Sequence, residues 1–199
     1  MNFENGHIYH IFNQGNNRQP IFLRNENYHF FFKKIATYIF PFADILAWCL
    51  MPNHFHLMVL VNDISGGATL SRTPTQLPDN FNKSIGIMLA SYTRAINNQQ
   101  FQSGSLFRDK TKAECLSKAE GVQPSFFNTS SGTFINLPNH EKEYPQICFN
   151  YIHNNPVKAG LVNRCEDWEF SSYREYCGLR NEKLINEIKA NELELKIKY

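Results

Sequence analysis

Two histidines separated by one residue stand inside a strongly apolar run. His54 and His56 lie in the segment 48–61, where Asn53 is the other polar residue. Side chains of a β-strand alternate between its two faces, so a strand here would project both imidazoles to the same side. Two adjacent imidazoles can share one divalent metal ion. The alternative is that one histidine is a hydrogen-bonded core residue and the other is incidental, and the segment alone does not separate these interpretations.

A second polar pair follows about ninety residues later. Cys148, Tyr151, Ile152 and Asn155 are spaced as i, i+3, i+4 and i+7, which places them on one face of a helix. A buried asparagine amide needs hydrogen-bond partners or a ligand. If this helix packs over the histidine face, the Asn155 oxygen is a candidate third metal ligand and the Tyr151 hydroxyl a candidate nucleophile. A phenol has a pKa of about 10, so it needs activation or a polarised electrophile such as a metal-bound phosphodiester.

The hydrophobic patterns predict the elements that must position these side chains. Alternation and apolar runs predict four strands, at 6–14, 43–50, 55–61 and 109–116. Helical spacing predicts three helices: one from Glu26 to about Phe40 capped by Asn25, one capped by Asp79 or Asn80, and one from Pro145 limited by Pro156. The order strand, helix, strand, strand, helix, strand, helix predicts an α+β, ferredoxin-like antiparallel sheet with the helices packed on one face.

The length of 199 residues suits one domain with additions. We expect a catalytic domain at 1–178 and a C-terminal helical tail at 179–199. The stretch 117–142 is rich in Ser, Asn, Gly and Pro and lacks apolar periodicity, which predicts a mobile surface insertion within that domain.

Composition limits the partners and the compartment. Five scattered cysteines without a C-x-x-C pair favour a reducing compartment, and no run is long enough to span a membrane, so we expect a cytoplasmic protein. The formal net charge is only +2, so nucleic-acid binding would depend on a local basic patch. The candidate phosphate contacts are Arg18, Arg94, Arg108, Lys110, Lys112 and Lys158. Several of them are equally well explained as solvated surface residues.

Two segments together resemble a known family. Residues 51–56 resemble the His-hydrophobic-His (HUH) motif of single-tyrosine transposases, and residues 151–162 resemble the second motif of the REP-associated tyrosine transposase branch. Residues 168–173 resemble the segment that follows there, so the similarity extends over most of 6–176. The resemblance implies the HUH endonuclease type of ferredoxin-like fold. It also implies that His54, His56 and Asn155 hold Mg²⁺ or Mn²⁺, with Asn155 replacing the Gln of the insertion-sequence members.

The same resemblance implies a reaction. Tyr151 would attack a DNA phosphate, giving a 5′-phosphotyrosine intermediate and a free 3′-hydroxyl that later rejoins strands. The expected function is a metal-dependent endonuclease and transposase acting on single-stranded DNA near hairpins. The family includes homodimers that exchange the tyrosine helix and REP-associated members that act as monomers, and both states stay open.

Two alternatives remain beside this function. A non-catalytic or domesticated hairpin-DNA-binding protein would keep the fold and the DNA contacts without cutting. A metal-free two-histidine phosphoesterase needs a second His-x-Thr/Ser motif, which the remaining histidines do not provide.

Overall fold

A four-stranded antiparallel sheet forms the centre of the molecule. The computed structural model describes residues 1–62, 80–117, 126–129, 132–135, 143–180 and 183–197. The sheet has the order β2-β3-β1-β4, and its strands are β1 (Ile8–Gln14), β2 (Ala43–Met51), β3 (His54–Val61) and β4 (Lys112–Cys115). This order and the α+β content confirm the ferredoxin-like prediction.

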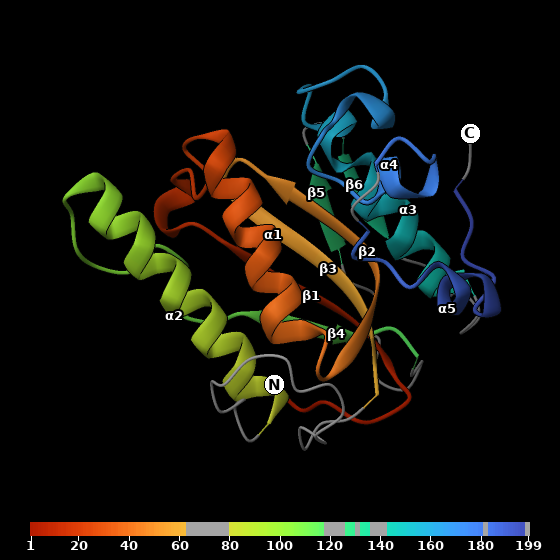
Figure 1. Cartoon of the computed structure of the whole chain (residues 1–199). Coiled ribbons are helices and arrows are strands. Elements are labelled where there is room, and N and C mark those ends of the chain that lie inside the picture. The colour runs from red at the N-terminus through yellow and green to blue at the C-terminus, as the bar shows by residue number, and fades with distance from the viewer. Residues whose placement is uncertain (63–79, 118–125, 130–131, 136–142, 181–182, 198–199) are drawn as a thin grey trace.

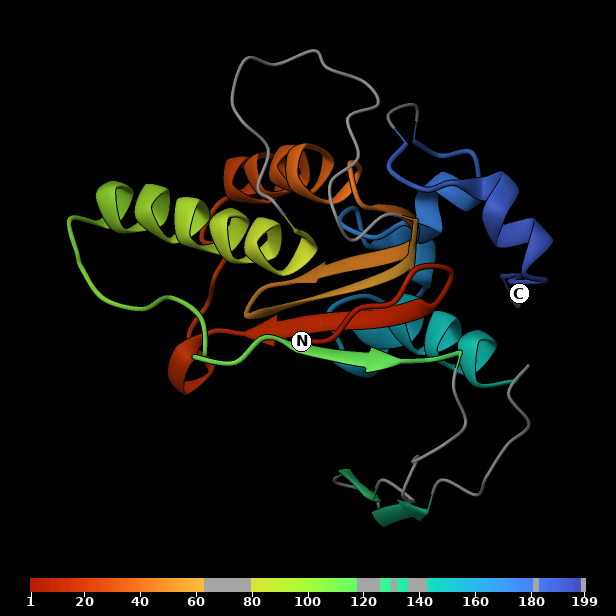
Figure 2. The ribbon, with the colours of Figure 1, turned by 90° about the horizontal axis from the view of Figure 1, so that it is seen from below.

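Helices cover both faces of this sheet. α1 (Asn25–Ile39) and α2 (Phe81–Gln100) lie on one face, and α3 (Glu143–Lys158) lies on the other, as Figures 1 and 2 show. The expectation that all helices share one face is therefore corrected. The reason is that β3 is apolar on both faces, so water must be excluded from each of them.

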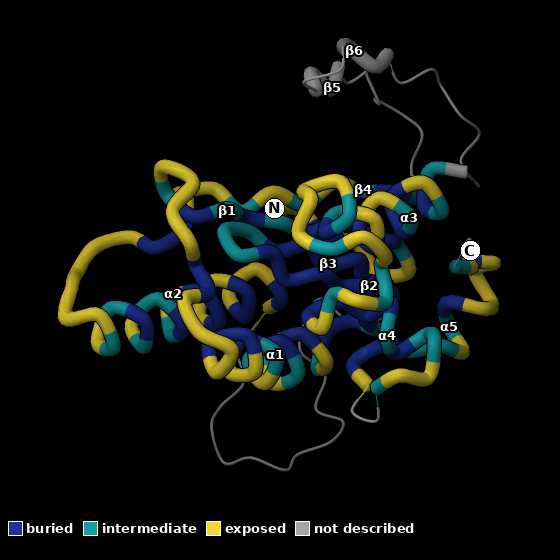
Figure 3. Tube along the Cα trace, turned by 90° about the horizontal axis from the view of Figure 1, so that it is seen from above, coloured by how far each residue is buried: buried dark blue, intermediate teal, exposed yellow. Residues whose placement is uncertain are grey.

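The pleat of β3 divides the core into two parts. Phe55, Leu57 and Val59 pack with α1 and α2, whereas Met58 packs with α3. Figure 3 shows that burial is concentrated along the strands between these two helical layers. Strand alternation thus sends His54 and His56 toward α3.

The ends of the helices follow local hydrogen bonding. The Asn80 side chain accepts a hydrogen bond from the Lys83 amide at 2.9 Å, so Asn80 caps α2. Asn25 does not cap α1, because it lies inside that helix and the Asn27 side chain accepts from the amides of Leu23 and Arg24 instead.

Pro156 does not end α3 as its sequence context predicts. The helix continues to Lys158, and the chain then turns at Gly160, whose φ of +69° is in the left-handed region. Proline lacks the amide that would bond one turn back, but this removes only one bond from the last turn. The amide of Leu161 donates to the Pro156 carbonyl at 3.0 Å and closes the helix end.

The chain after α3 hydrogen bonds to the outer edge of β2. The Leu50 amide donates to the Phe170 carbonyl at 2.9 Å, and the Ser172 amide donates to the Trp48 carbonyl at 2.9 Å. Further along, the Asn186 amide donates to the Ile45 carbonyl at 2.8 Å. These bonds cover a strand edge that would otherwise be free to pair with other chains. The short elements of this region are η2 (Cys165–Asp167), α4 (Tyr173–Tyr176) and α5 (Glu187–Glu192).

The structure describes parts of the two regions that were expected to form a helical tail and a surface insertion. In the described part of 179–199 only α5 is helical, and buried residues such as Leu184 and Leu195 pack this segment onto the core. Within 117–142, β5 (Phe126–Thr129) pairs antiparallel with β6 (Gly132–Ile135), a hairpin that the sequence does not indicate. The other residues of that stretch, except Ser117, and residues 63–79 lie outside the described part of the chain. No helix in the described part is long and apolar enough to cross a membrane.

Candidate functional site

His54 and His56 lie next to each other on the α3 face of the sheet. Their ring centroids are 5.0 Å apart and the rings are nearly perpendicular. His54 is half-buried at the start of β3, and His56 is buried opposite Phe12 of β1. The spacing of two residues on a strand therefore brings both imidazoles to one place, as predicted from the sequence.

The Nδ1 atom of His54 is held by a neighbouring amide. It lies 2.6 Å from the Asn53 Oδ1 atom, and the Asn53 Nδ2 group donates to the Arg18 carbonyl at 3.3 Å. Because the second bond fixes which end of the amide is oxygen, His54 must donate from Nδ1. Its Nε2 atom then carries a lone pair. Burial lowers the pKa of His54, and the Asn155 side chain opposes this shift.

His56 has its Nδ1 atom occupied in a different way. This atom is 2.9 Å from Nε2 of His10, a buried histidine on β1. The Nε2 atom of His56 is buried and has no hydrogen-bond partner among the described residues. Burial, followed by the neighbouring His10 and His54, holds the pKa of His56 well below its ordinary value. His56 is therefore neutral at pH 7, which is the form that binds metals.

Tyr151 lies at the rim of this cluster. Its ring meets the His56 ring edge-on, with centroids 5.4 Å apart, and it meets the His10 ring at 6.2 Å. The residue is 40% exposed, so it does not belong to the buried face of α3 that the spacing suggests. Burial of part of the side chain raises the pKa of Tyr151, and the Asn155 side chain partly offsets this rise. The phenol is protonated at neutral pH and is accessible to a large substrate.

Asn155 connects the tyrosine with the histidines. Its side chain acts on the pKa values of both His54 and Tyr151, so it faces both. Its Nδ2 atom is buried without a hydrogen-bond partner among the described residues. An unpartnered amide and an unpartnered imidazole nitrogen, both in side chains that neighbour Tyr151, fit a site that binds a ligand.

These residues can accommodate a divalent cation. Two imidazole Nε2 atoms and one amide oxygen provide three neutral ligands, and other positions would remain open for substrate oxygens. Among the described residues, no three side chains of the types His, Cys, Asp and Glu converge as a metal cluster. The candidate set therefore depends on the Asn155 amide as its third member.

His153 anchors the helix that carries Tyr151. It is buried, and its Nε2 atom is 2.7 Å from the Ser172 hydroxyl, which also bonds to the backbone of Trp48 in β2. Burial lowers the pKa of His153 to about 3, so it is a neutral structural histidine. α3 is thus fixed to the sheet two residues away from the candidate nucleophile.

The predicted basic residues divide into two groups. The Lys158 ammonium is 5.5 Å from the centroid of the Tyr151 ring, and the Lys112 ammonium is 5.8 Å from that of Phe12, which packs beside His56. Both lysines therefore lie at the site. The backbone of Arg18 supports the Asn53 amide, and the Arg18 side chain is exposed.

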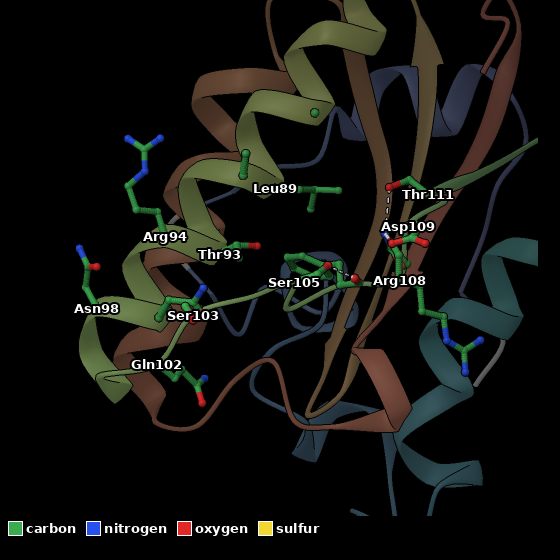
Figure 4. A pocket seen from close by; sticks show the side chains of 15 residues that line it. Leu89, Thr93, Arg94, Asn98, Gln102, Ser103, Ser105, Arg108, Asp109 and Thr111 are labelled. Carbon is green, nitrogen blue, oxygen red and sulfur yellow. Dashed lines mark hydrogen bonds between the residues drawn. The ribbon is translucent and has the colours of Figure 1, made fainter.

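The remaining basic residues lie farther along the surface. An open cavity of about 700 Å³ lies between α2 and the chain that leads into β4 (Figure 4). Arg94 lies on the α2 side of it, and Arg108 lies on the side of the chain that leads into β4. Arg94 is on a helix of the opposite face and does not join the histidine site. Lys110 is exposed between Arg108 and Lys112.

Three residues of the site were not predicted from the sequence, namely His10, Asn53 and Glu114. The alternation of β1 places His10 on the same face as Phe12, which is a usable signal. However, its neighbours depend on the strand register, which pairs His10 with Glu114 on β4 and Phe12 with His56 on β3. That register is not readable from local sequence.

The chain is similar to a known protein at the level of structure. No family model matches the chain, and no curated protein matches it. Among solved structures, a REP-associated tyrosine transposase bound to a REP hairpin is similar over 94% of this chain and 94% of its own chain, with a TM-score of 0.58 and 17% sequence identity. The chain therefore shares the fold of a REP-associated tyrosine transposase.

Proposed function

We propose that this protein is a metal-dependent endonuclease and transposase that cleaves and rejoins single-stranded DNA near hairpins. The observation that carries the proposal is the position of Tyr151. An accessible phenol lies edge-on against a buried histidine whose Nε2 atom is unpartnered among the described residues, on a helix that is anchored over both histidines. The solved structure that shares this fold contains a REP hairpin, which supports hairpin DNA as the partner.

The proposed metal ligands are distinct from the proposed nucleophile. The Nε2 atoms of His54 and His56, with the Asn155 oxygen, would hold Mg²⁺ or Mn²⁺. When bound, such a cation polarises a phosphodiester oxygen and stabilises the charge that develops on it. The burial of His56 keeps its imidazole neutral, so its lone pair is available at neutral pH.

Tyr151 supplies the nucleophile. Its phenol loses its proton and the oxygen attacks phosphorus, forming an O–P bond while the bond from phosphorus to the 3′ oxygen breaks. The 3′ oxygen takes up a proton and leaves as a free hydroxyl, and the 5′ phosphate stays on the tyrosine. Attack by a 3′-hydroxyl on this phosphotyrosine reverses the step. One phosphodiester replaces another, so no oxidant or nucleotide triphosphate is consumed.

Lys158 favours this attack by electrostatics. Its ammonium is 5.5 Å from the Tyr151 ring, where a positive charge stabilises the phenolate relative to the phenol. Lys112, at the start of β4, and Arg108, in the chain before it, would contact DNA phosphates.

The test is covalent capture of labelled DNA. The purified protein is mixed with a 5′- and 3′-labelled single-stranded hairpin oligonucleotide and Mn²⁺, and a denaturation-resistant adduct is expected. Tyr151→Phe keeps the ring and should lose the adduct while it retains DNA binding. Tyr144→Phe is the matched control, because Tyr144 lies two turns earlier on α3, about 10 Å along the axis. An adduct that survives in Tyr151→Phe contradicts the proposed nucleophile, and DNA binding without any adduct supports the non-catalytic binding protein.

A further inference from the structure

A carboxylate and two histidines lie in a chain of polar contacts across three strands of the sheet. Glu114 of β4 lies opposite His10 of β1, and its Oε2 atom is 3.8 Å from the His10 Nδ1 atom. The His10 Nε2 atom is in turn 2.9 Å from the His56 Nδ1 atom. The chain therefore ends at the buried Nε2 atom of His56, which is unpartnered among the described residues.

Only one arrangement of protons satisfies this chain. In the first arrangement, His56 donates from Nδ1 to His10, and His10 donates from Nδ1 toward the Glu114 carboxylate. In the second, His10 donates from Nε2 to His56. A lone pair of His10 then faces the carboxylate, and an Nε2 hydrogen of His56 is buried without an acceptor. A carboxylate can only accept, and a buried donor without a partner is costly, so the first arrangement is favoured.

We propose that His10, supported by Glu114, holds His56 in the tautomer whose Nε2 lone pair points into the site. This inference rests on the proposed function, because it assigns a positioning role toward the metal that His56 would bind. Neither His10 nor Glu114 would touch the metal or the DNA. They would act on the ligand through its other ring nitrogen, as partners of metal-binding histidines commonly do.

The two residues should contribute unequally. His10 is buried, and its bond to His56 has an ordinary hydrogen-bond length. The Glu114 side chain is about half exposed at 52%, and its distance from His10 is longer. Water and salt screen the Glu114–His10 pair more than the His10–His56 pair. The loss of Glu114 should therefore affect the His56 tautomer less than the loss of His10 does.

The first measurement is the tautomeric state of the histidines in the metal-free protein. Long-range ¹H–¹⁵N correlation spectra of ¹⁵N-histidine-labelled protein at pH 7.5 should show His56 protonated at Nδ1. This readout needs neither metal nor DNA, so it is independent of catalysis. A His56 ring protonated at Nε2 in the wild-type protein would overturn the proposal.

The second measurement is Mn²⁺ affinity by calorimetry. His10→Phe keeps a ring between Phe12 and His56 but removes the acceptor, and it should weaken Mn²⁺ binding by about 10–100-fold and mix the His56 tautomers. His10→Gln can place an amide oxygen near the position of the former nitrogen and should retain most of the affinity. Glu114→Gln should weaken Mn²⁺ binding less than His10→Phe and more than His10→Gln. If one variant folds poorly, the tautomer measured in the wild-type protein still decides the proposal.

The matched control is Glu4→Gln. Glu4 pairs with His7 at 3.7 Å, so this substitution removes the charge from another histidine–carboxylate pair, one at the start of the chain. It should leave the His56 tautomer and the Mn²⁺ affinity unchanged. Equal affinity in the wild type, His10→Phe and Glu4→Gln would refute the positioning role. By contrast, the expected tautomer without Mn²⁺ binding in the wild type would refute the metal site and leave the positioning of the His56 tautomer by His10 intact.

Discussion

At the scale of single residues, His54 and His56 have equivalent positions in the motif but differ in burial. We expect His54→Ala and His56→Ala each to abolish Mn²⁺ binding, because each removes one of two Nε2 ligands. His54 is half-buried, so its loss should change stability little. His56 is buried and bonded to His10, so its loss should lower the free energy of unfolding by about 1–3 kcal/mol.

Calorimetry with Mn²⁺ and chemical denaturation of the metal-free protein measure these two effects separately. His29→Ala, which removes an exposed histidine of α1, is the control and should change neither quantity. Unchanged Mn²⁺ affinity in both His54→Ala and His56→Ala would show that the pair is not the metal site.

At the scale of elements, a buried carboxylate attaches the C-terminal segment to the sheet. Glu175 accepts hydrogen bonds from the Trp48 Nε1 group at 2.6 Å and from the amides of Leu184 and Ile185 at 2.8 and 3.0 Å. Burial raises the pKa of Glu175, and these three bonds oppose the rise. Glu175→Ala leaves three donors unsatisfied and should lower the free energy of unfolding by about 2–4 kcal/mol.

Urea denaturation measures this decrease. Glu187→Ala is the control, because Glu187 pairs with Lys183 at 3.0 Å on the exposed surface and such pairs contribute less than about 1 kcal/mol. Equal decreases in the two variants would mean that the bonds to Glu175 do not hold the segment in place.

The strand β4 and the chain before it carry the expected DNA contacts. Arg108→Glu with Lys112→Glu should weaken hairpin binding. It should also reduce the slope of log K against log salt concentration by about 0.7 for each single-strand phosphate that the protein no longer neutralises. Arg94→Glu is the matched control, since Arg94 is exposed on α2, across the sheet from the histidines. If Arg94→Glu reduces the slope of log K against log salt concentration and the Arg108→Glu, Lys112→Glu variant does not, the DNA binds on the α2 face of the sheet and not on the face of the histidines.

At the scale of the whole molecule, a buried histidine couples folding to pH. The pKa of His153 is about 3 in the folded protein, against about 6.5 in an unfolded chain. Between these values the unfolded state binds the additional proton, so stability is fully present above about pH 6.5 and falls as the pH drops toward 3. One such group changes the free energy of unfolding by about 1.4 kcal/mol per pH unit within that window.

Denaturation curves collected across that range test this coupling. His153→Gln should lower stability at pH 7.5, because it disturbs the bond to Ser172, and should make the curve of stability against pH shallower. A variant with the full wild-type slope would show that other groups cause the acid sensitivity.

The sequence by itself determined the order of the elements and the direction of the motif residues. Strand alternation placed His54 and His56 on one face, and helical spacing placed Tyr151 and Asn155 on neighbouring positions of one helix. These are local properties, because the pleat and the helical repeat follow from backbone geometry within a few residues. The ferredoxin-like sheet order followed from the sequence of strands and helices.

Only the tertiary structure decided which side chains meet. The register of β1 against β3 and β4 brings His10 and Glu114 to His56, and the attachment of α3 through His153 leaves Tyr151 exposed at the rim. It also decided that Asn186 bonds to the edge of β2, although the sequence predicts a helical tail at 179–199. The bond between His10 and His56 joins residues 46 positions apart, and the bond between Trp48 and Glu175 joins residues 127 positions apart. Packing and strand pairing set such contacts, and no local pattern can.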